Sequence, residues 1–135
     1  MFVYRCRQIA RLSLPRRYPE VKGPSVVGLS PEALERLLTG DQVVLVDVRE
    51  RVEHWLGSIA GSRLAALSAL PVEELAKQAG RLVLYCQSGA RSAQAAARIS
   101  ACAGVPVRHL EGGIHAWSAS GRTVARFGSG GSGKA

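Results

Sequence analysis

Short apolar runs alternate with helical stretches through the middle of the chain. The apolar runs cover residues 25–30, 42–48, 81–86 and 105–110. Runs of strand length that are apolar without alternation are typical of strands buried on both faces of a parallel sheet. The stretches with helical spacing or composition cover residues 31–40, 71–80, 91–104 and 112–121, and a short helical turn is expected within 51–62. This order predicts an α/β fold with a parallel sheet and right-handed crossovers.

Capping signals mark the ends of the expected helices. Ser30 stands directly before Pro31, and this pair is typical of an N-cap followed by the first helical residue. Gly40 ends the same stretch. Pro71 and Gly80 bound the second helical stretch in the same way.

Charge and composition divide the chain into three parts. The 135 residues suffice for one domain, and 47% hydrophobic content supports a buried core. The formal charge of +8 first suggests nucleic acid, but residues 25–121 carry nine basic and nine acidic side chains. We therefore expect a neutral domain at 24–121, a flexible basic arm at 1–23 and a Gly/Ser-rich flexible tail at 122–135. No nucleic-acid partner is expected, and no run approaches the roughly 18 apolar residues of a membrane span.

The arm and the cysteines bear on the cellular compartment. An Arg-rich arm with one acidic residue is compatible with a mitochondrial targeting segment, but also with an ordinary disordered extension. The three cysteines, Cys6, Cys86 and Cys102, are odd in number and widely spaced, so they suggest neither a disulfide framework nor a zinc site. A reducing, cytoplasmic setting is the simplest expectation.

Cys86 ends an apolar run and precedes the Ala-rich helical stretch in "LVLYCQSGARSAQAAARIS". Ligands of open α/β sheets bind beyond the carboxyl ends of the strands. A loop that turns into a helix N-terminus there directs several N–H groups at one point, where a thiolate is stabilised. Gly89 allows the turn, and Arg91 adds positive charge. An isolated cysteine is more often a buried packing residue, but the neighbouring "QSGAR" favours a nucleophile.

Three segments resemble one family. "CQSGARS" is similar to the active-site loop of rhodanese-like sulfurtransferases, "LVDVRERVEHWLGSIAGS" to the family's D-V-R-E segment, and "LEGGIHAW" to its E-G-G-x-x-x-W signature. The segments follow the family's order, and the resemblance covers roughly residues 24–121. It implies a three-layer fold in which helices flank both faces of a central parallel sheet.

The resemblance also implies a reaction. Cys86 would attack the outer sulfur of a donor such as thiosulfate and carry that sulfur as a persulfide. A thiol, cyanide or a protein sulfur acceptor would take the sulfur, and neither metal nor organic cofactor is needed. The implied anion cradle comprises the amides of Gln87, Ser88, Gly89, Ala90 and Arg91, together with the Ser88 and Ser92 hydroxyls. Asp47, Arg49 and Glu111 match positions that we interpret as structural support.

Some positions depart from the family pattern. Gln87 stands where relatives that use thiosulfate often carry Arg or Lys, which lowers the positive potential at the loop and allows another donor. His54 replaces an aromatic residue, which we interpret as a tolerated change. His109 and His115 lie far from the cysteine loop in sequence, so they are expected to be structural rather than general bases.

Two alternatives remain open. One is a phosphatase or arsenate reductase of the related cysteine-loop type, which has five residues between cysteine and arginine, whereas four separate Cys86 from Arg91. The other is a non-enzymatic sulfur-relay or docking module, which would keep the same loop.

Overall fold

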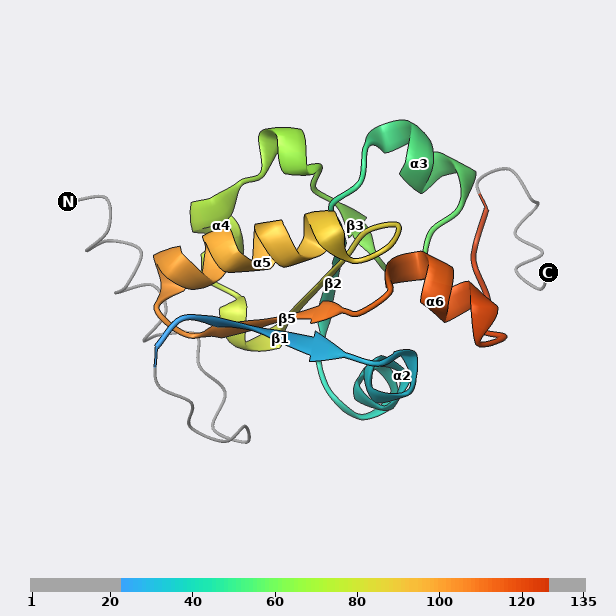
Figure 1. Ribbon diagram of the computed structural model, residues 1–135, viewed down its shortest axis with the longest axis horizontal. Coiled ribbons are helices and arrows are strands. Elements are labelled where there is room, and N and C mark those ends of the chain that lie inside the picture. Colours follow the sequence, from blue (N-terminus) through green and yellow to red (C-terminus); the bar gives the residue numbers. More distant parts are fainter. Residues whose placement is uncertain (1–22, 127–135) are drawn as a thin grey trace.

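The computed structural model describes residues 23–126; the predicted basic arm, apart from Gly23, and the Gly/Ser-rich end of the tail lie outside the described residues. Five parallel strands form one sheet in the order β1-β5-β4-β2-β3 (Figure 1). The strands are β1 (Ser25–Leu29), β2 (Val44–Asp47), β3 (Arg63–Leu64), β4 (Leu82–Tyr85) and β5 (Pro106–Leu110). Strand β4 is fully buried at the centre of the sheet, as its unbroken apolar run predicts.

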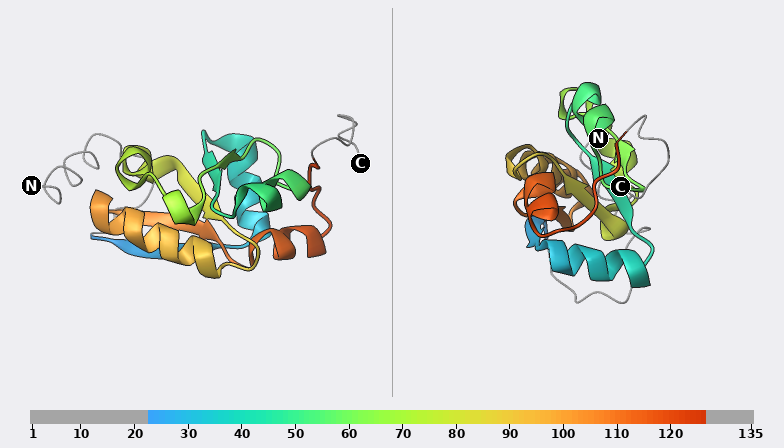
Figure 2. Two further views of the ribbon diagram at one scale, coloured as in Figure 1. Left: turned by 90° about the horizontal axis from the view of Figure 1, so that it is seen from above. Right: turned by 90° about the vertical axis from the view of Figure 1, so that its right-hand side faces the viewer.

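Helices cover both faces of the sheet, which confirms the predicted three-layer α/β fold (Figures 1 and 2). The helices are α2 (Pro31–Gly40), α3 (Arg51–Leu56), α4 (Val72–Ala76), α5 (Ala90–Ala103) and α6 (Gly113–Ala119), with short 3-10 turns η1 (Leu67–Ala69) and η2 (Ala79–Arg81). Leu75 of α4 and Ile99 of α5 pack in one apolar cluster. Leu34 of α2 and Trp117 of α6 pack in the cluster on the opposite face.

Local signals explain several of these boundaries. The Ser30 side chain accepts a hydrogen bond from the Ala33 amide at 3.1 Å, which confirms the predicted N-cap of α2. The helix expected at 71–80 ends at Ala76 and is followed by the 3-10 turn η2. Strand β3 has only two residues, too few for a periodic pattern to reveal.

Packed structure continues past residue 121, where the flexible tail was expected to begin. Ala125 forms an isolated antiparallel bridge with Ser58. Arg122 donates a hydrogen bond of 2.8 Å to the Glu35 carboxylate of α2. Backbone pairing and an ion pair therefore attach residues 122–126 to the domain. The Gly/Ser-rich sequence that follows these residues gives no indication of this attachment.

The carboxyl ends of the parallel strands meet at one edge of the sheet. In Figure 1 the loop between β4 and α5 lies at this edge, with α3 and α6 on either side of it. Within residues 23–126, none of the helices combines the length and apolar character that a membrane crossing requires.

Candidate active site

The predicted nucleophile lies where β4 gives way to α5. Strand β4 ends at Tyr85, so Cys86 is the first residue beyond the carboxyl end of a central strand. The chain turns through Gly89, whose φ of 108° lies in the left-handed region that favours glycine. Gly89 is also the N-cap of α5, so the loop curls back towards the amides of the first helical turn. The permissive backbone predicted for Gly89 is confirmed.

Several hydrogen-bond donors converge on the Cys86 sulfur. The amides of Gly89 and Ser92 lie 3.1 and 3.3 Å from Sγ, and the Ser92 hydroxyl oxygen lies 3.6 Å from it. Burial alone would raise the pKa of the Cys86 thiol. The Ser92 hydroxyl and the amides of Ser92, Gly89 and Ser88 outweigh burial, and the pKa is lowered from its ordinary value. The loop therefore favours an anionic sulfur.

The cradle is smaller than the sequence suggests. The amides of Gln87, Ala90 and Arg91 are also predicted donors, but no hydrogen bond among the described residues joins them to the sulfur. The Ser92 amide is a donor that lies outside the predicted set, in which Ser92 contributes its hydroxyl alone. In an α-helix the first amides have no intrahelical partner, so the second residue after Ala90 is well placed to face the sulfur.

Cys86 is almost completely covered. Its exposed fraction is 1%, and it contacts the apolar cluster beneath α5. Gln87, Ser88 and Ala90, which surround it in the loop, are exposed. The thiol therefore lies directly beneath the loop, with apolar side chains behind it and hydrogen-bond donors in front.

Arg91 faces a carboxylate of α3. Its guanidinium donates hydrogen bonds of 2.8 and 2.9 Å to the two oxygens of Glu53. This pairing is the largest cause that lowers the pKa of Glu53 to about 2, and it raises the pKa of Arg91. Glu53 also accepts a hydrogen bond from the Glu50 amide at 3.1 Å, as part of a capping box. Sequence reasoning missed Glu53; its position three residues after Glu50 was the available signal.

Asp47 holds Arg49 in a buried network. Arg49 donates to both Asp47 oxygens, with distances of 2.9 Å from Nε to Oδ1 and 2.7 Å from Nη2 to Oδ2. Burial acts to lower the pKa of Arg49, but the Asp47 carboxylate outweighs it and the pKa is raised. Nδ1 of His54 lies 2.9 Å from Asp47, so this departure from the family pattern adds a partner to the network. Arg49 also donates to the Gly57 carbonyl at 2.6 Å.

This network contacts the cysteine loop from the side of α3. Nη1 of Arg49 lies 3.4 Å from the Gln87 side-chain oxygen, a long hydrogen bond. The Arg49 guanidinium lies over the Tyr85 ring, 5.7 Å from its centroid. In these contacts the polar atoms of Asp47 and Arg49 face one another and the Gln87 side chain.

The two glycines after Glu111 bring α6 against the cysteine loop. The amides of Ile114 and His115 donate to the carbonyls of Cys86 and Gln87, at 2.8 and 3.1 Å. A Cβ on Gly113 would collide with these same carbonyls, and the φ of Gly113 is 63°. The "EGG" signature therefore has a steric cause.

Glu111 follows strand β5 and contacts the neighbouring edge strand β1. Its amide donates to the Leu29 carbonyl at 2.8 Å. Its carboxylate occupies the space where Gly28 would carry a Cβ. Both contacts attach the end of β5 to β1.

His109 lies close to the thiol although it is distant in sequence. Its Nδ1 lies 2.9 Å from the Ser92 hydroxyl, and the residue is 8% exposed. Burial lowers the pKa of His109. The register that pairs His109 with Leu84 places it beside β4 just before Cys86. Distance along the sequence does not reveal this proximity, because neighbouring parallel strands bring distant strand ends together.

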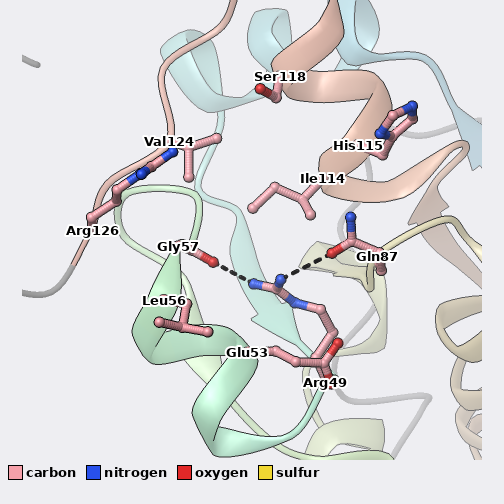
Figure 3. Close-up of a pocket in the computed structure, with 10 residues that line it drawn as sticks. All are labelled: Arg49, Glu53, Leu56, Gly57, Gln87, Ile114, His115, Ser118, Val124 and Arg126. Atoms are coloured by element: carbon pink, nitrogen blue, oxygen red, sulfur yellow. Dashed lines mark hydrogen bonds between the residues drawn. The ribbon is translucent and has the colours of Figure 1, made fainter.

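A pocket of about 350 Å³ adjoins the loop at Gln87 (Figure 3). Arg49 lies at its centre in the view, between Gly57 and Gln87. Helix α6 contributes His115 to one wall, and Arg126 lies on another. Cys86 does not line this pocket, so the pocket lies beside the cradle rather than above the sulfur. Among residues 23–126 no cluster of His, Cys, Asp and Glu side chains could hold a metal ion.

The sequence of this chain is similar to those of known proteins. The profile of a family described as rhodanese-like domain matches residues 30–120. An uncharacterized protein of Synechocystis sp. is 38% identical over 96 residues, which cover 70% of this chain and 54% of that protein. A sulfurtransferase of Allochromatium vinosum is 36% identical over 92 residues, which cover 67% of this chain and 85% of that protein.

A solved structure of a rhodanese-related protein has a similar fold. The crystal structure of a rhodanese-related protein from Thermoplasma volcanium has a TM-score of 0.63 and 28% identity, and the match covers 73% of this chain and 97% of that one. The chain thus spans about half the length of the Synechocystis relative and nearly all of the Thermoplasma structure.

Proposed function

Because the chain belongs to the family of rhodanese-like domains, we propose that it transfers a sulfane sulfur from a donor such as thiosulfate to a thiophilic acceptor through a persulfide on Cys86. The observation that carries the proposal is the convergence of the Gly89 and Ser92 amides on the Cys86 sulfur. These donors stabilise negative charge at the atom that must attack.

The first step forms the persulfide. The Cys86 thiolate attacks the outer sulfur of thiosulfate, so a bond forms between Sγ and that sulfur. The sulfur–sulfur bond of thiosulfate breaks, and sulfite leaves with the bonding electron pair. In the second step the acceptor attacks the outer sulfur of the persulfide, and Cys86 leaves as a thiolate. The same loop donors stabilise the reacting sulfur in both steps. The Cys86 thiolate is anionic before the first step and after the second, and the outer sulfur of the persulfide is anionic between them.

Arg91 and Gln87 define the charge at the loop surface. The positive charge of Arg91 is paired with Glu53, and Gln87 is neutral. The loop therefore attracts anionic donors less strongly than a loop with an unpaired cation would. A donor other than thiosulfate, such as a protein or low-molecular-weight persulfide, fits this charge balance.

A phosphatase or arsenate reductase fits the site less well. Only four residues separate Cys86 from Arg91, and the guanidinium of Arg91 is paired with Glu53. Assays with para-nitrophenyl phosphate and with thiosulfate plus cyanide separate the two activities. We expect turnover only in the second assay.

One surface favours a protein acceptor as a second candidate. Helix α3 exposes the apolar side chains of Val52, Trp55 and Leu56 beside Glu53, the partner of Arg91. An exposed apolar surface next to a reactive loop is suited to a protein partner. Slow turnover with cyanide, together with rapid transfer to a protein persulfide acceptor, would favour a relay module over an enzyme for small acceptors.

The test of the proposal is intact-protein mass spectrometry after incubation with thiosulfate and other sulfane donors. We expect a gain of about 32 Da that cyanide reverses. The Cys86→Ser variant should show no gain. Equal lack of modification in both proteins with every donor would contradict the proposal.

A further inference from the structure

Ser92 connects the Cys86 sulfur to a buried histidine. The Ser92 hydroxyl oxygen lies 3.6 Å from the Cys86 sulfur and 2.9 Å from Nδ1 of His109. All three residues are buried, at the end of β4, in the first turn of α5 and near the end of β5. The hydroxyl also lies 3.2 Å from the Gly89 carbonyl. Three groups thus compete for one hydroxyl.

The hydroxyl of Ser92 has a single proton to donate. If Nδ1 of His109 carries no proton, it accepts that proton, and the anionic sulfur then faces an oxygen lone pair. If Nδ1 carries a proton, the imidazole donates to Ser92 instead. The Ser92 proton is then available for the sulfur or for the Gly89 carbonyl. The carbonyl already accepts from the Ala93 amide at 3.0 Å, whereas an anionic sulfur is the stronger acceptor.

We propose that His109 is a positioning residue that donates a hydrogen bond from Nδ1 to Ser92 and so directs the Ser92 hydroxyl proton to the Cys86 sulfur. This inference rests on the proposed function in one respect: it identifies what stabilises the reacting sulfur of that site. His109 touches neither sulfur nor substrate and acts through Ser92.

The charged groups around this chain of contacts are consistent with a neutral imidazole donor. Burial lowers the pKa of His109, and the Glu111 carboxylate acts in the opposite direction without outweighing burial. The charge of Arg91, which also interacts with Cys86, is paired with Glu53. A neutral His109 carries one ring proton, so its tautomer decides the direction of the hydrogen bond with Ser92.

The first test is a coupling experiment on the thiol. The pKa of Cys86 is read from the pH dependence of its alkylation by iodoacetamide, followed at the Cys86 peptide by mass spectrometry. His109→Leu should raise this pKa by about one unit, which lowers the thiolate fraction about tenfold below the pKa. His109→Asn, whose side-chain amide still donates, should stay within about 0.3 unit of wild type. His115→Leu is the matched control, because that side chain lines the neighbouring pocket and should not change the thiol pKa.

A Ser92→Ala background distinguishes positioning from general structural damage. Ser92→Ala should itself raise the thiol pKa, and adding His109→Leu should then cause no further rise. Equal shifts in the two backgrounds would overturn the proposal. In wild type, nitrogen-15 NMR should show neutral His109 protonated at Nδ1; protonation at Nε2 alone would overturn the proposal even if His109→Leu does not fold.

These readouts are separate from sulfur transfer. If coupling and tautomer are as expected but no persulfide forms, the proposed function fails and the positioning role stands. If the persulfide forms on Cys86 but the coupling is absent, the positioning role fails and the proposed function stands.

Discussion

Arg91 of the cysteine loop donates two hydrogen bonds to Glu53 of α3, at 2.8 and 2.9 Å. The guanidinium is therefore paired with a carboxylate. The sequence assigned Arg91 to the anion cradle, and its pairing with Glu53 makes it a brace between α5 and α3 as well. The charge available to an incoming donor depends on this pair.

Neutralising Glu53 should make the loop more attractive to anionic donors. In Glu53→Gln the positive charge of Arg91 is no longer compensated, while the amide oxygen can still accept from the Glu50 backbone. We expect the KM for thiosulfate to fall about two- to fivefold at low salt and to approach wild type at high salt. Steady-state kinetics at several ionic strengths checks this. Glu50→Gln, whose carboxylate faces Ser68, is the control, and an equal change in both variants would argue against the pair.

The same pair should give a pH-dependent contribution to stability. The folded pKa of Glu53 is lowered to about 2 from the ordinary 4.5, so the contribution is complete above pH 4.5 and disappears as the pH falls towards 2. Because both side chains are about a third exposed, the contribution should stay below about 1 kcal/mol. Urea unfolding of wild type and Glu53→Gln should differ at pH 6 and converge near pH 2. A difference that grows on acidification would contradict this assignment.

Removing the Asp47 charge should strongly destabilise the fold. Asp47→Asn leaves the buried Arg49 guanidinium without its counter-charge, and breaking a buried pair costs about 3–5 kcal/mol. The control is Glu35→Gln, which breaks the more exposed pair with Arg122 and should cost less than about 1 kcal/mol. The free energy of unfolding from urea titration measures both. Similar losses in the two variants would show that the Asp47 network is not a principal support.

Gly113 tests the steric cause of the "EGG" signature. Gly113→Ala should combine the left-handed backbone penalty with a collision against the carbonyls of Cys86 and Gln87. Gly121 also has a positive φ, but nothing lies within 4 Å of its Cβ position, so Gly121→Ala isolates the backbone penalty of about 1–2 kcal/mol. We expect Gly113→Ala to lose more stability than this control and to slow persulfide formation at least tenfold. Equal losses and unchanged persulfide formation would contradict the steric account.

The residues that sequence reasoning placed well follow local rules. The N-cap at Ser30 and the turn at Gly89 depend on one or two residues whose backbone preferences are strong. Strand β4 was recognisable because a fully buried strand is apolar without interruption. Local preference and burial therefore account for the fold class and for the position of Cys86 at a strand end.

The site residues that the sequence does not reveal depend on partners distant along the chain. Glu53 reaches Arg91 across 38 positions, and His109 reaches Ser92 across 17, through the packing of α3 and the register of β5. No periodicity encodes such contacts. Parallel strands do place their carboxyl ends together, however, so the end of β5 was foreseeable as a neighbour of the cysteine loop once the strand order was known.

The proposed function depends on a loop that lowers the pKa of the Cys86 thiol. The most direct test is a pH titration of thiolate absorbance near 240 nm, taken as the difference between wild type and Cys86→Ser so that the absorbance of the rest of the chain cancels. We expect an apparent pKa for Cys86 below the ordinary 9.0, because the donors from Ser92 and Gly89 outweigh burial. A value at or above 9.0 would show that burial dominates and would contradict the account.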